Sequence, residues 1–521
     1  MKRGLLTSIL LLTITGLQAQ NAVRPRLVVS LCIDQLRTDY VEAFAPLYGS
    51  QGFKRLAAEG RVYSQVNFSF NAPDRASAVA AIYSGTTPSV NGITAAQWMD
   101  ADAGRVTSCV DDPDFMGNYT SESSSPRQLL VSTLPDELKV ATRGQALVYS
   151  IAPMRDAAIL SAGHAANCAF WLNQNTGKWC STTFYKDFPW WLNQYNEQQG
   201  TDSRVRDMVW TPVFPASSYE FLPGTRTEAF RHDIDNDRLN AYRELVTTPF
   251  INDEVNRLAD ELVGKNALGK DDTTDFMALT YFGGNYGHRS TQQCAMEVQD
   301  MYVRLDRSIG DLLAILDKHV GLEHVMLVLT STGCTEPEVD DLSLYNIPGG
   351  EFHLNRCATL LNMYLMATYG EGQYVQSFHD QQIYLNHKLI EDKKLDMDAV
   401  RSKSAQFLAE FSGVGEVYDA SRLLMSTSNE REERARNGYH RKRSGDLMIE
   451  VLPGWSIVDE QTEAKHIVNN SQVPSPFIIL APSVKAETIS TPVKAEYIAP
   501  TVAEAIHIRA PNGCTNQSLG L

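Results

Sequence analysis

The feature that most constrains the fold is a set of short, fully apolar runs separated by helical patterns. The runs span residues 27–33, 146–151, 276–282 and 325–330, with a fifth at 477–480. Runs of this length without polar alternation are typical of parallel strands buried on both faces. Between the third and fourth runs, apolar residues recur at spacings of three and four, as on one face of a helix: Val298, Met301, Leu305, Ile309, Leu312 and Leu316. Strands alternating with helices predict an α/β fold with a mostly parallel central sheet and helices on both faces.

The order of the runs predicts how the chain is divided. Residues 20–355 are expected to form the first part of the α/β core, and residues 426–521 its C-terminal part. Residues 356–425 mix helical and extended patterns, so we expect an inserted cap or subdomain there. A second insertion is expected near residues 170–250, where an aromatic segment favours the packing of a small lobe over a ligand-stacking platform: Phe184, Tyr185, Phe188, Trp190 and Trp191.

The first residues have the pattern of a secretory signal peptide. Lys2 and Arg3 precede an apolar run, and Ala19 offers signal peptidase a small residue at the cut. A membrane anchor is the alternative, but the run is shorter than the roughly 20 residues needed to span a bilayer. We therefore expect residues 1–19 to be removed and the protein to work in the periplasm or elsewhere outside the cytoplasm. We do not expect an integral membrane protein.

Charge and cysteine content narrow the classes of partner. The net charge of −16 argues against nucleic acid, which needs a concentrated basic face. Eight cysteines are scattered without a CxxC pair, which gives no sign of a zinc or redox motif. An oxidising compartment permits disulfides, and Cys168 with Cys180 is the nearest plausible pair, although connectivity cannot be deduced from sequence.

Chemistry is expected beyond the carboxyl ends of the strands, where open α/β sheets bind ligands. Asp34 follows the first run and could hold a metal or a phosphate, or equally cap the next helix. Glycines at 283, 284 and 287 follow the third run with His288, a candidate metal ligand or a structural histidine. Residues 331–334 after the fourth run offer hydroxyls but no carboxylate or imidazole, which is a poor set for zinc.

Several segments in order along the chain resemble the alkaline phosphatase superfamily, in its periplasmic single-chain phosphate-monoesterase branch, which is type I phosphodiesterase/phosphatase-like. Together they span nearly the whole chain beyond residue 19. The segments are Ile33-Asp34-Gln35 with Arg37-x-Asp39-Tyr40, Gly52 to Leu56, Ile82 to Pro88 with Gly92-Ile93, Leu134 to Leu138, Ala158-Ile159-Leu160 with Gly163-His164, Arg304-Leu305-Asp306, Ser444-Gly445-Asp446, Val473-Pro474 and Ile498 to Thr501.

The resemblance implies a two-zinc site with a Thr or Ser nucleophile, and this sequence departs from it. Arg75 stands at or next to the nucleophile position, between Asp74 and the displaced Ser77. An Arg cannot attack phosphorus, and Ser77 could do so only if the helix began elsewhere. The phosphate-holding Asn is replaced by Ala96, and the Lys-x-Arg clamp by Met154 and Asp156. Arg155, between these two, is expected to point away, because neighbours on an extended segment face opposite ways.

The metal ligands that the resemblance implies are also mostly missing. Asp34 remains, while Asn285 and His288 match a ligand pair only one residue out of register. Thr332 and Gln472 stand where further ligands are implied. Two ligands cannot hold two zinc ions, because each ion needs three or four donors. We therefore expect no cofactor, or zinc if the site has been rebuilt.

Three hypotheses follow. The first is a pseudoenzyme that keeps the phosphatase framework for binding or envelope assembly. The alternative is an active phosphoester hydrolase with one metal at Asp34 and His288 and a hydroxyl from Ser77 or Thr332. The third names an envelope protein partner, bound through the insertion after Arg356. Oligomeric state and substrate stay open.

Overall fold

The computed structural model describes residues 24–100, 103–185, 188–234, 240–334, 349–425, 429–452, 454–458, 465–466 and 473–521. The predicted signal peptide, residues 1–19, lies outside the described residues.

A large mixed sheet forms the centre of the molecule, and its middle strands are parallel. β1 (Leu27–Asp34), buried along its whole length, pairs in parallel with β11 (Asp275–Phe282) and β12 (Val325–Ser331). β6 (Val148–Ala152) and β7 (Cys168–Leu172) continue the parallel part beyond β11. On the other side, β20 (Ser475–Leu480) is antiparallel to both β12 and β2 (Arg61–Asn67). The sheet ends in β21 (Glu487–Ile489) and β22 (Val493–Lys494) at one side and β8 (Trp179–Thr182) and β5 (Gly117–Asn118) at the other.

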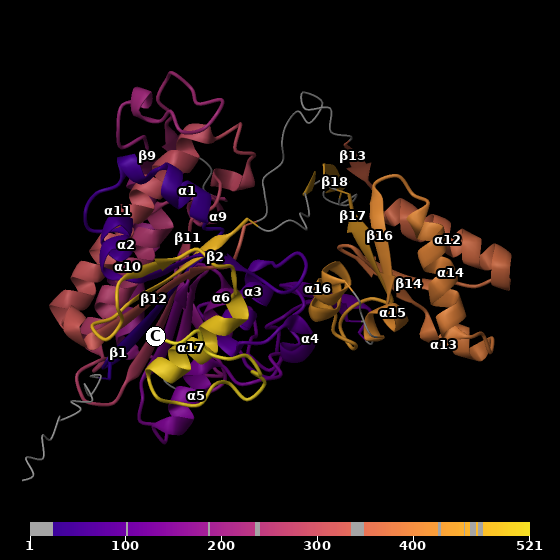
Figure 1. Ribbon diagram of the computed structural model, residues 1–521, viewed down its shortest axis with the longest axis horizontal. Helices are drawn as coiled ribbons and strands as arrows, with labels where there is room; N and C mark the ends of the chain where they lie inside the picture. Colours follow the sequence, from indigo (N-terminus) through magenta and orange to yellow (C-terminus); the bar gives the residue numbers. More distant parts are fainter. Residues whose placement is uncertain are drawn as a thin grey trace, which may run out of the picture.

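Helices cover both faces of this sheet, as Figure 1 shows. One face carries α2 (Phe53–Glu59), α10 (Phe250–Lys265) and α11 (Ala295–His319), and the other carries α3 (Arg75–Ser84), α6 (Arg155–Ala162) and α17 (Ile498–Ala505). The predicted stripe from Val298 to Leu316 lies on α11, and all six of its residues are buried. The five apolar runs therefore form strands, and the prediction of an α/β fold with a mostly parallel central sheet and helices on both faces is confirmed.

The aromatic segment is built differently from the predicted insertion. Residues 168–172 and 179–182 are strands of the central sheet itself. Tyr185 and Trp191 are buried in the main hydrophobic core, which also contains Trp171 and Trp179. The aromatic segment therefore belongs to the main core and does not form a separate lobe, because its buried side chains pack against strands of the central sheet.

A second hydrophobic core lies in the right-hand, orange lobe of Figure 1. Its sheet has the order β14 (Val375–His379), β15 (Gln382–Leu385), β17 (Leu447–Val451) and β16 (Val414–Asp419), and all three pairings are antiparallel. The predicted subdomain boundary at residue 425 falls inside this lobe, because β17 is an interior strand of its sheet. The lobe also contains α12 (Leu354–Tyr369), α13 (His387–Asp392), α14 (Met397–Ala409), α15 (Ala420–Leu424) and α16 (Glu430–Gly438), with β13 (Gly350–Phe352), β18 (Trp455–Val458) and β19 (Lys465–His466) as a small sheet.

Shorter elements complete the described chain. No helix in the described ranges is both long enough and apolar enough to cross a membrane. The remaining helices and strands are β3 (Gln97–Asp100), β4 (Arg105–Ser108), β9 (Val209–Trp210), β10 (His232–Asp233), α1 (Thr38–Ala43), α4 (Pro88–Asn91), α5 (Leu134–Ala141), α7 (Trp190–Gln198), α8 (Thr201–Arg204) and α9 (Ala241–Leu245).

The cysteine pair suggested by the sequence is not joined in the structure. All eight cysteines are free thiols. The register of β7 and β8 places Cys180 opposite Trp171, three residues along the strand from Cys168. The Cys168 thiol instead lies 3.2 Å from the hydroxyl of Ser181.

Candidate active site

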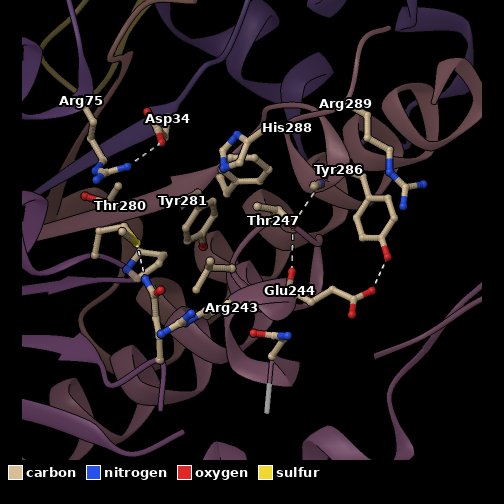
Figure 2. Close-up of a pocket in the computed structure, with 17 residues that line it drawn as sticks. Asp34, Arg75, Arg243, Glu244, Thr247, Thr280, Tyr281, Tyr286, His288 and Arg289 are labelled. Atoms are coloured by element: carbon tan, nitrogen blue, oxygen red, sulfur yellow. Dashed lines mark hydrogen bonds and ion pairs between the residues drawn. The ribbon is translucent and has the colours of Figure 1, made fainter. Parts of the chain in front are cut away.

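The carboxyl ends of the parallel strands meet at one edge of the central sheet, and a cavity of about 530 Å³ opens there. Asp34 at the end of β1 lines it, together with residues 280–282 of β11 and Met154 just beyond β6. Figure 2 shows Asp34 with Thr280 and Tyr281, and it shows Arg75, at the start of α3, and His288 turned toward Asp34. A second hollow of about 370 Å³ adjoins the first across Arg75 and Met154.

Arg75 is held between two carboxylates. Its Nε and Nη2 donate to the two oxygens of Asp156 at 3.1 and 3.0 Å, a bidentate arrangement. Its Nη1 lies 3.6 Å from Oδ2 of Asp34. Burial by itself would lower the pKa of the Arg75 guanidinium, but the charges of Asp156 and Asp34 outweigh it and raise that pKa. Arg75 is therefore a permanent cation at or next to the position where the resemblance implies the nucleophile.

The start of α3 explains why Ser77 cannot take over as nucleophile. Asp74 caps the helix by accepting from the backbone N–H of Ser77 at 2.8 Å and from its hydroxyl at 2.6 Å. The Ser77 side chain is fully buried. Burial raises the pKa of Asp74, while its hydrogen bonds from Ser77 and Ala96 oppose that shift. The helix begins at Arg75, so the shifted start that the rebuilt-site hypothesis requires of Ser77 is absent.

Asp34 does not cap a helix, and its carboxylate binds a hydroxyl instead. The residue at the N-cap of α1 is Arg37, so the capping interpretation of Asp34 is wrong. The hydroxyl of Thr332 donates to Oδ1 of Asp34 at 2.6 Å and accepts from the backbone N–H of Gln35 at 3.2 Å. Both Asp34 and Thr332 are buried. Asp34 is therefore bound by one hydroxyl and one guanidinium.

His288 and Asn285 take different positions near the mouth of the cavity. His288 has a left-handed backbone (φ 54°), and its ring lies edge-on to Phe282. Desolvation lowers the pKa of His288; Asp34 opposes that shift and Arg75 adds to it. The amide nitrogen of Asn285 donates to the backbone oxygen of Arg289 at 2.9 Å. Asn285 thus holds its own turn.

The phosphate-clamp positions carry structural roles in this chain. The backbone N–H of Ala96 donates to Asp74 at 2.5 Å, and Met154 is the N-cap residue of α6. The carboxylate of Asp156 binds the Arg75 guanidinium. Arg155 does turn away, to Asp111 at 2.9 Å and Ser124 at 3.0 Å, but the reason given from the sequence is wrong. Arg155 is the first residue of α6, so helical rather than extended geometry separates its direction from that of Asp156.

Among the residues that the structure describes, the donors at this edge do not fit a pair of zinc ions. Across the part of the chain that the structure describes, no group of three His, Cys, Asp or Glu side chains could hold a metal. Zinc sites need three or four such donors, and a hydroxyl with a guanidinium supplies none. Gln472, the last of the implied ligand positions, lies outside the described residues.

The sequence did not single out several residues of the cavity wall. Arg243, Glu244 and Thr247 come from α9 and the turn after it, and Tyr286 and Arg289 follow β11 (Figure 2). Tyr286 donates its hydroxyl to Glu244, and the guanidinium of Arg289 lies 5.0 Å from the Tyr286 ring centre. The glycine-rich turn after the third run pointed to residues near 286. No local signal marked Arg243, because α9 reaches the cavity only through the tertiary fold.

Comparisons with known proteins agree with this architecture. The sequence profile of the family described as type I phosphodiesterase / nucleotide pyrophosphatase matches residues 28–473. Alkaline phosphatase PafA of Elizabethkingia meningoseptica is 30% identical over 99% of this chain and 98% of its own length. Alkaline phosphatase PhoV of Synechococcus elongatus is 29% identical over 95% of this chain and 92% of its own length.

Solved structures extend the likeness to three dimensions. Wild-type PafA has a TM-score of 0.83 at 27% identity, over 95% of this chain and 98% of that one. A PafA variant with one Thr, one Asn, one Lys and one Arg substituted has a TM-score of 0.85 at 28% identity, with the same coverage.

Proposed function

Because this chain belongs to the type I phosphodiesterase / nucleotide pyrophosphatase family, with alkaline phosphatase-like relatives, we propose that it is a pseudoenzyme, an exported member that has lost catalysis. In this proposal the protein keeps the phosphatase framework for binding or for envelope assembly. An envelope protein binds it through the second lobe, which contains the insertion predicted after Arg356. Export is proposed from the signal-peptide pattern of residues 1–19.

The observation that carries the proposal is the position of the Arg75 guanidinium. It lies between Asp34 and Asp156 and binds the latter through two hydrogen bonds. Two buried carboxylates need a neighbouring cation, since unpaired buried charge is costly. Where the resemblance implies metal ions and a nucleophile, one side chain supplies the positive charge and no nucleophile. The guanidinium offsets one of the two negative charges, so the site attracts a zinc ion less strongly than two carboxylates without a cation would.

The substituted PafA variant supports the assignment of positions. The Thr and the Asn changed in that enzyme have the same separation along its chain as Arg75 and Ala96 have here. The Lys and the Arg changed there have the same separation as Met154 and Asp156. These four residue types are those that the resemblance implies for the nucleophile and the phosphate clamp. The present chain has none of them at the corresponding positions.

One contact favours the second candidate, an active hydrolase with a rebuilt site. The 2.6 Å hydrogen bond from Thr332 to Asp34 is the geometry expected of a nucleophile and its base. Two features weigh against this candidate. Thr332 is almost fully buried, and the nearest cation, Arg75, is already bound to Asp156, which leaves little to stabilise phosphoryl oxygens beside that hydroxyl.

Metal analysis and turnover of the purified protein test the proposal. We expect protein isolated from an envelope fraction without chelator to begin at Gln20, to hold no stoichiometric zinc and to hydrolyse no aryl phosphate in a zinc-dependent way. Arg75→Thr, which returns a hydroxyl, is expected to remain inactive because Ala96, Met154 and Asp156 cannot hold a phosphate. The same preparation shows whether a stable partner co-purifies.

The decisive control is a pair of carboxylate substitutions. Zinc-dependent turnover that is abolished by Asp34→Ala and kept by Asp272→Ala, a change at an exposed carboxylate, would establish the hydrolase instead. Stoichiometric zinc lost only in Asp34→Ala would revive a metal site even without turnover.

A further inference from the structure

A separate cavity of about 1000 Å³ lies in the second lobe. Its wall is formed by the end of β15 and the start of α13, by Arg401 of α14, by α15, and by the loop of residues 439–446 that leads into β17. α13 and α15 lie in the lower part of the orange lobe in Figure 1, and no residue of this wall lines the cavity at Asp34. The proposed function assigns no role to this cavity.

The floor of the cavity is a buried carboxylate whose charge is already balanced. Asp446 accepts from the backbone N–H of Leu385 at 2.9 Å and from Nε2 of His387 at 2.9 Å. Nε and Nη2 of Arg401 donate to the same carboxylate at 3.0 and 2.6 Å. Burial would raise the pKa of Asp446, but the contacts with His387, Leu385 and Arg401 lower it. Asp446 is thus an ionised anchor that fixes a histidine and an arginine at the wall.

The motif Ser444-Gly445-Asp446 sets this floor in place. A side chain at Gly445 would put its first carbon 2.8 Å from the backbone oxygen of Ile383. The loop can therefore approach β15 closely only with glycine at this position. The hydroxyl of Ser444 accepts from the backbone N–H of His440 at 3.0 Å, which closes the loop on itself. These contacts hold the loop against β15, and the same loop carries Arg441 and Lys442.

The cavity wall carries more positive charge than is needed to neutralise Asp446. Lys388, Arg441 and Lys442 line the cavity and are exposed to solvent. Within the described ranges, none of the three makes an ion pair, and Asp446 is the sole carboxylate of the wall. A chain with a net charge of −16 has many acidic residues that could pair with them. A hollow with three unmatched cations focuses a positive potential that attracts anions.

From this juxtaposition we infer that the second-lobe cavity binds a phosphate monoester, with Lys388, Arg441 and Lys442 holding the phosphate and the remaining space holding the organic group. Three cations suit a dianion better than a single carboxylate, and an arginine fork matches phosphate geometry. The volume is that of a small-molecule pocket. Tyr384, Tyr439 and Leu424 in the wall give the organic group apolar surface.

Calorimetric titration of the full mature protein tests the inference. Glucose 6-phosphate is the soluble probe, glucose is its uncharged control, and vesicles with phosphatidic acid, against phosphatidylcholine alone, probe a lipid source of the same group. We expect binding of at least one phosphate-bearing probe and of neither control. The double variant Arg441→Gln/Lys442→Gln is expected to weaken it about tenfold or more, as loss of charged hydrogen bonds predicts.

Two matched double variants make the result specific. Arg143→Gln/Lys485→Gln removes the same charge at exposed positions of the main lobe and should leave the affinity unchanged. Arg243→Gln/Arg289→Gln removes cations from the cavity at Asp34 and should also leave it unchanged. The inference is overturned if no phosphate-bearing probe binds, or if binding survives Arg441→Gln/Lys442→Gln and is lost in either matched variant. Because no turnover or zinc is measured, failure here is distinct from failure of the proposed function.

Discussion

A single side chain changes the electrostatics of the whole active-site edge. In this chain Arg75 brings a guanidinium to the place where the family resemblance implies a neutral hydroxyl beside metal ions. The carboxylate of Asp156 turns a clamp position from cationic to anionic and binds that guanidinium at 3.0 Å. The two residues compensate one another, because Arg75 pairs the buried charge of Asp156, and Asp156 gives the guanidinium its bidentate partner beside Asp34. The implied hydroxyl and the implied clamp cation are thus replaced together, by one arginine–aspartate pair.

This compensation predicts an unequal response at two arginine–aspartate pairs. Asp156→Asn leaves Arg75 without its bidentate partner in a buried site, and we expect the free energy of unfolding to fall by about 2 kcal/mol, less than for a fully enclosed pair. The side chain of Asp111 is 44% exposed, so Asp111→Asn, which breaks the pair with Arg155, should cost about 0.5 kcal/mol. Urea unfolding at neutral pH measures both values. Equal losses would show that Arg75 is not held by its charge.

At the scale of elements, helix starts carry the site and are tied to distant turns. Asp136 in the first turn of α5 forms a capping box with Thr133. Its carboxylate also accepts from the backbone N–H of His164 at 2.7 Å, and it lies 2.9 Å from Nδ1 of that ring. The turn that ends α6 is therefore fastened to the start of α5 by an ionisable pair. The sequence had marked both segments only as family motifs.

The Asp136–His164 pair predicts a pH-dependent stability. Burial would raise the pKa of Asp136 and lower that of His164, but their hydrogen bond and opposite charges reverse both shifts. The histidine contribution is fully present below its ordinary pKa of 6.5 and is lost as pH rises through the raised value. The aspartate contribution is present above its ordinary pKa of 3.8 and is lost as pH falls through the lowered value.

Both contributions are therefore present between those two ordinary values. Urea unfolding should show that His164→Gln lowers stability more at about pH 5.5 than at about pH 8.5. The exposed His507→Gln serves as the control and should show no such difference. A loss of equal size at both pH values would mean that His164 acts only through packing.

At the scale of the whole molecule, Arg443 fastens the second lobe to the main one. It stands in the loop before β17, and it is buried against the main lobe. Its guanidinium donates to the backbone oxygen of Gly92 and, at 2.9 Å, to Oε1 of Gln128, and it lies 4.8 Å from the ring centre of Trp98. Burial lowers the pKa of Arg443 to about 10, so the side chain remains charged at neutral pH.

Removing this contact should make the two lobes unfold separately. Each lobe has its own hydrophobic core, so cooperativity between them depends on their interface. We expect scanning calorimetry of Arg443→Ala to show two transitions where the unchanged protein shows one, with a loss of about 2 kcal/mol in coupling. Arg441→Ala, two residues away and exposed, should keep the single transition. Two transitions in the unchanged protein would contradict the role given to Arg443.

Local patterns in the sequence were enough to predict the class of fold. The five apolar runs and the stripe on α11 are local patterns, because strand and helix periodicities are written in neighbouring residues. The prediction that Arg75, Ala96 and Asp156 depart from the family rests on the surrounding motifs, which set the register of the resemblance.

The partners of these residues depend on contacts that form when distant segments fold together. Arg75 finds Asp156 across 81 positions of sequence, and β17 joins the second lobe although the chain pattern suggested a boundary at 425. Aromatic residues near 170–190 could pack in a lobe of their own or on the main sheet. They pack on the main sheet because β7 and β8 pair within it. Such choices depend on contacts between segments far apart in the chain, which local periodicity does not encode.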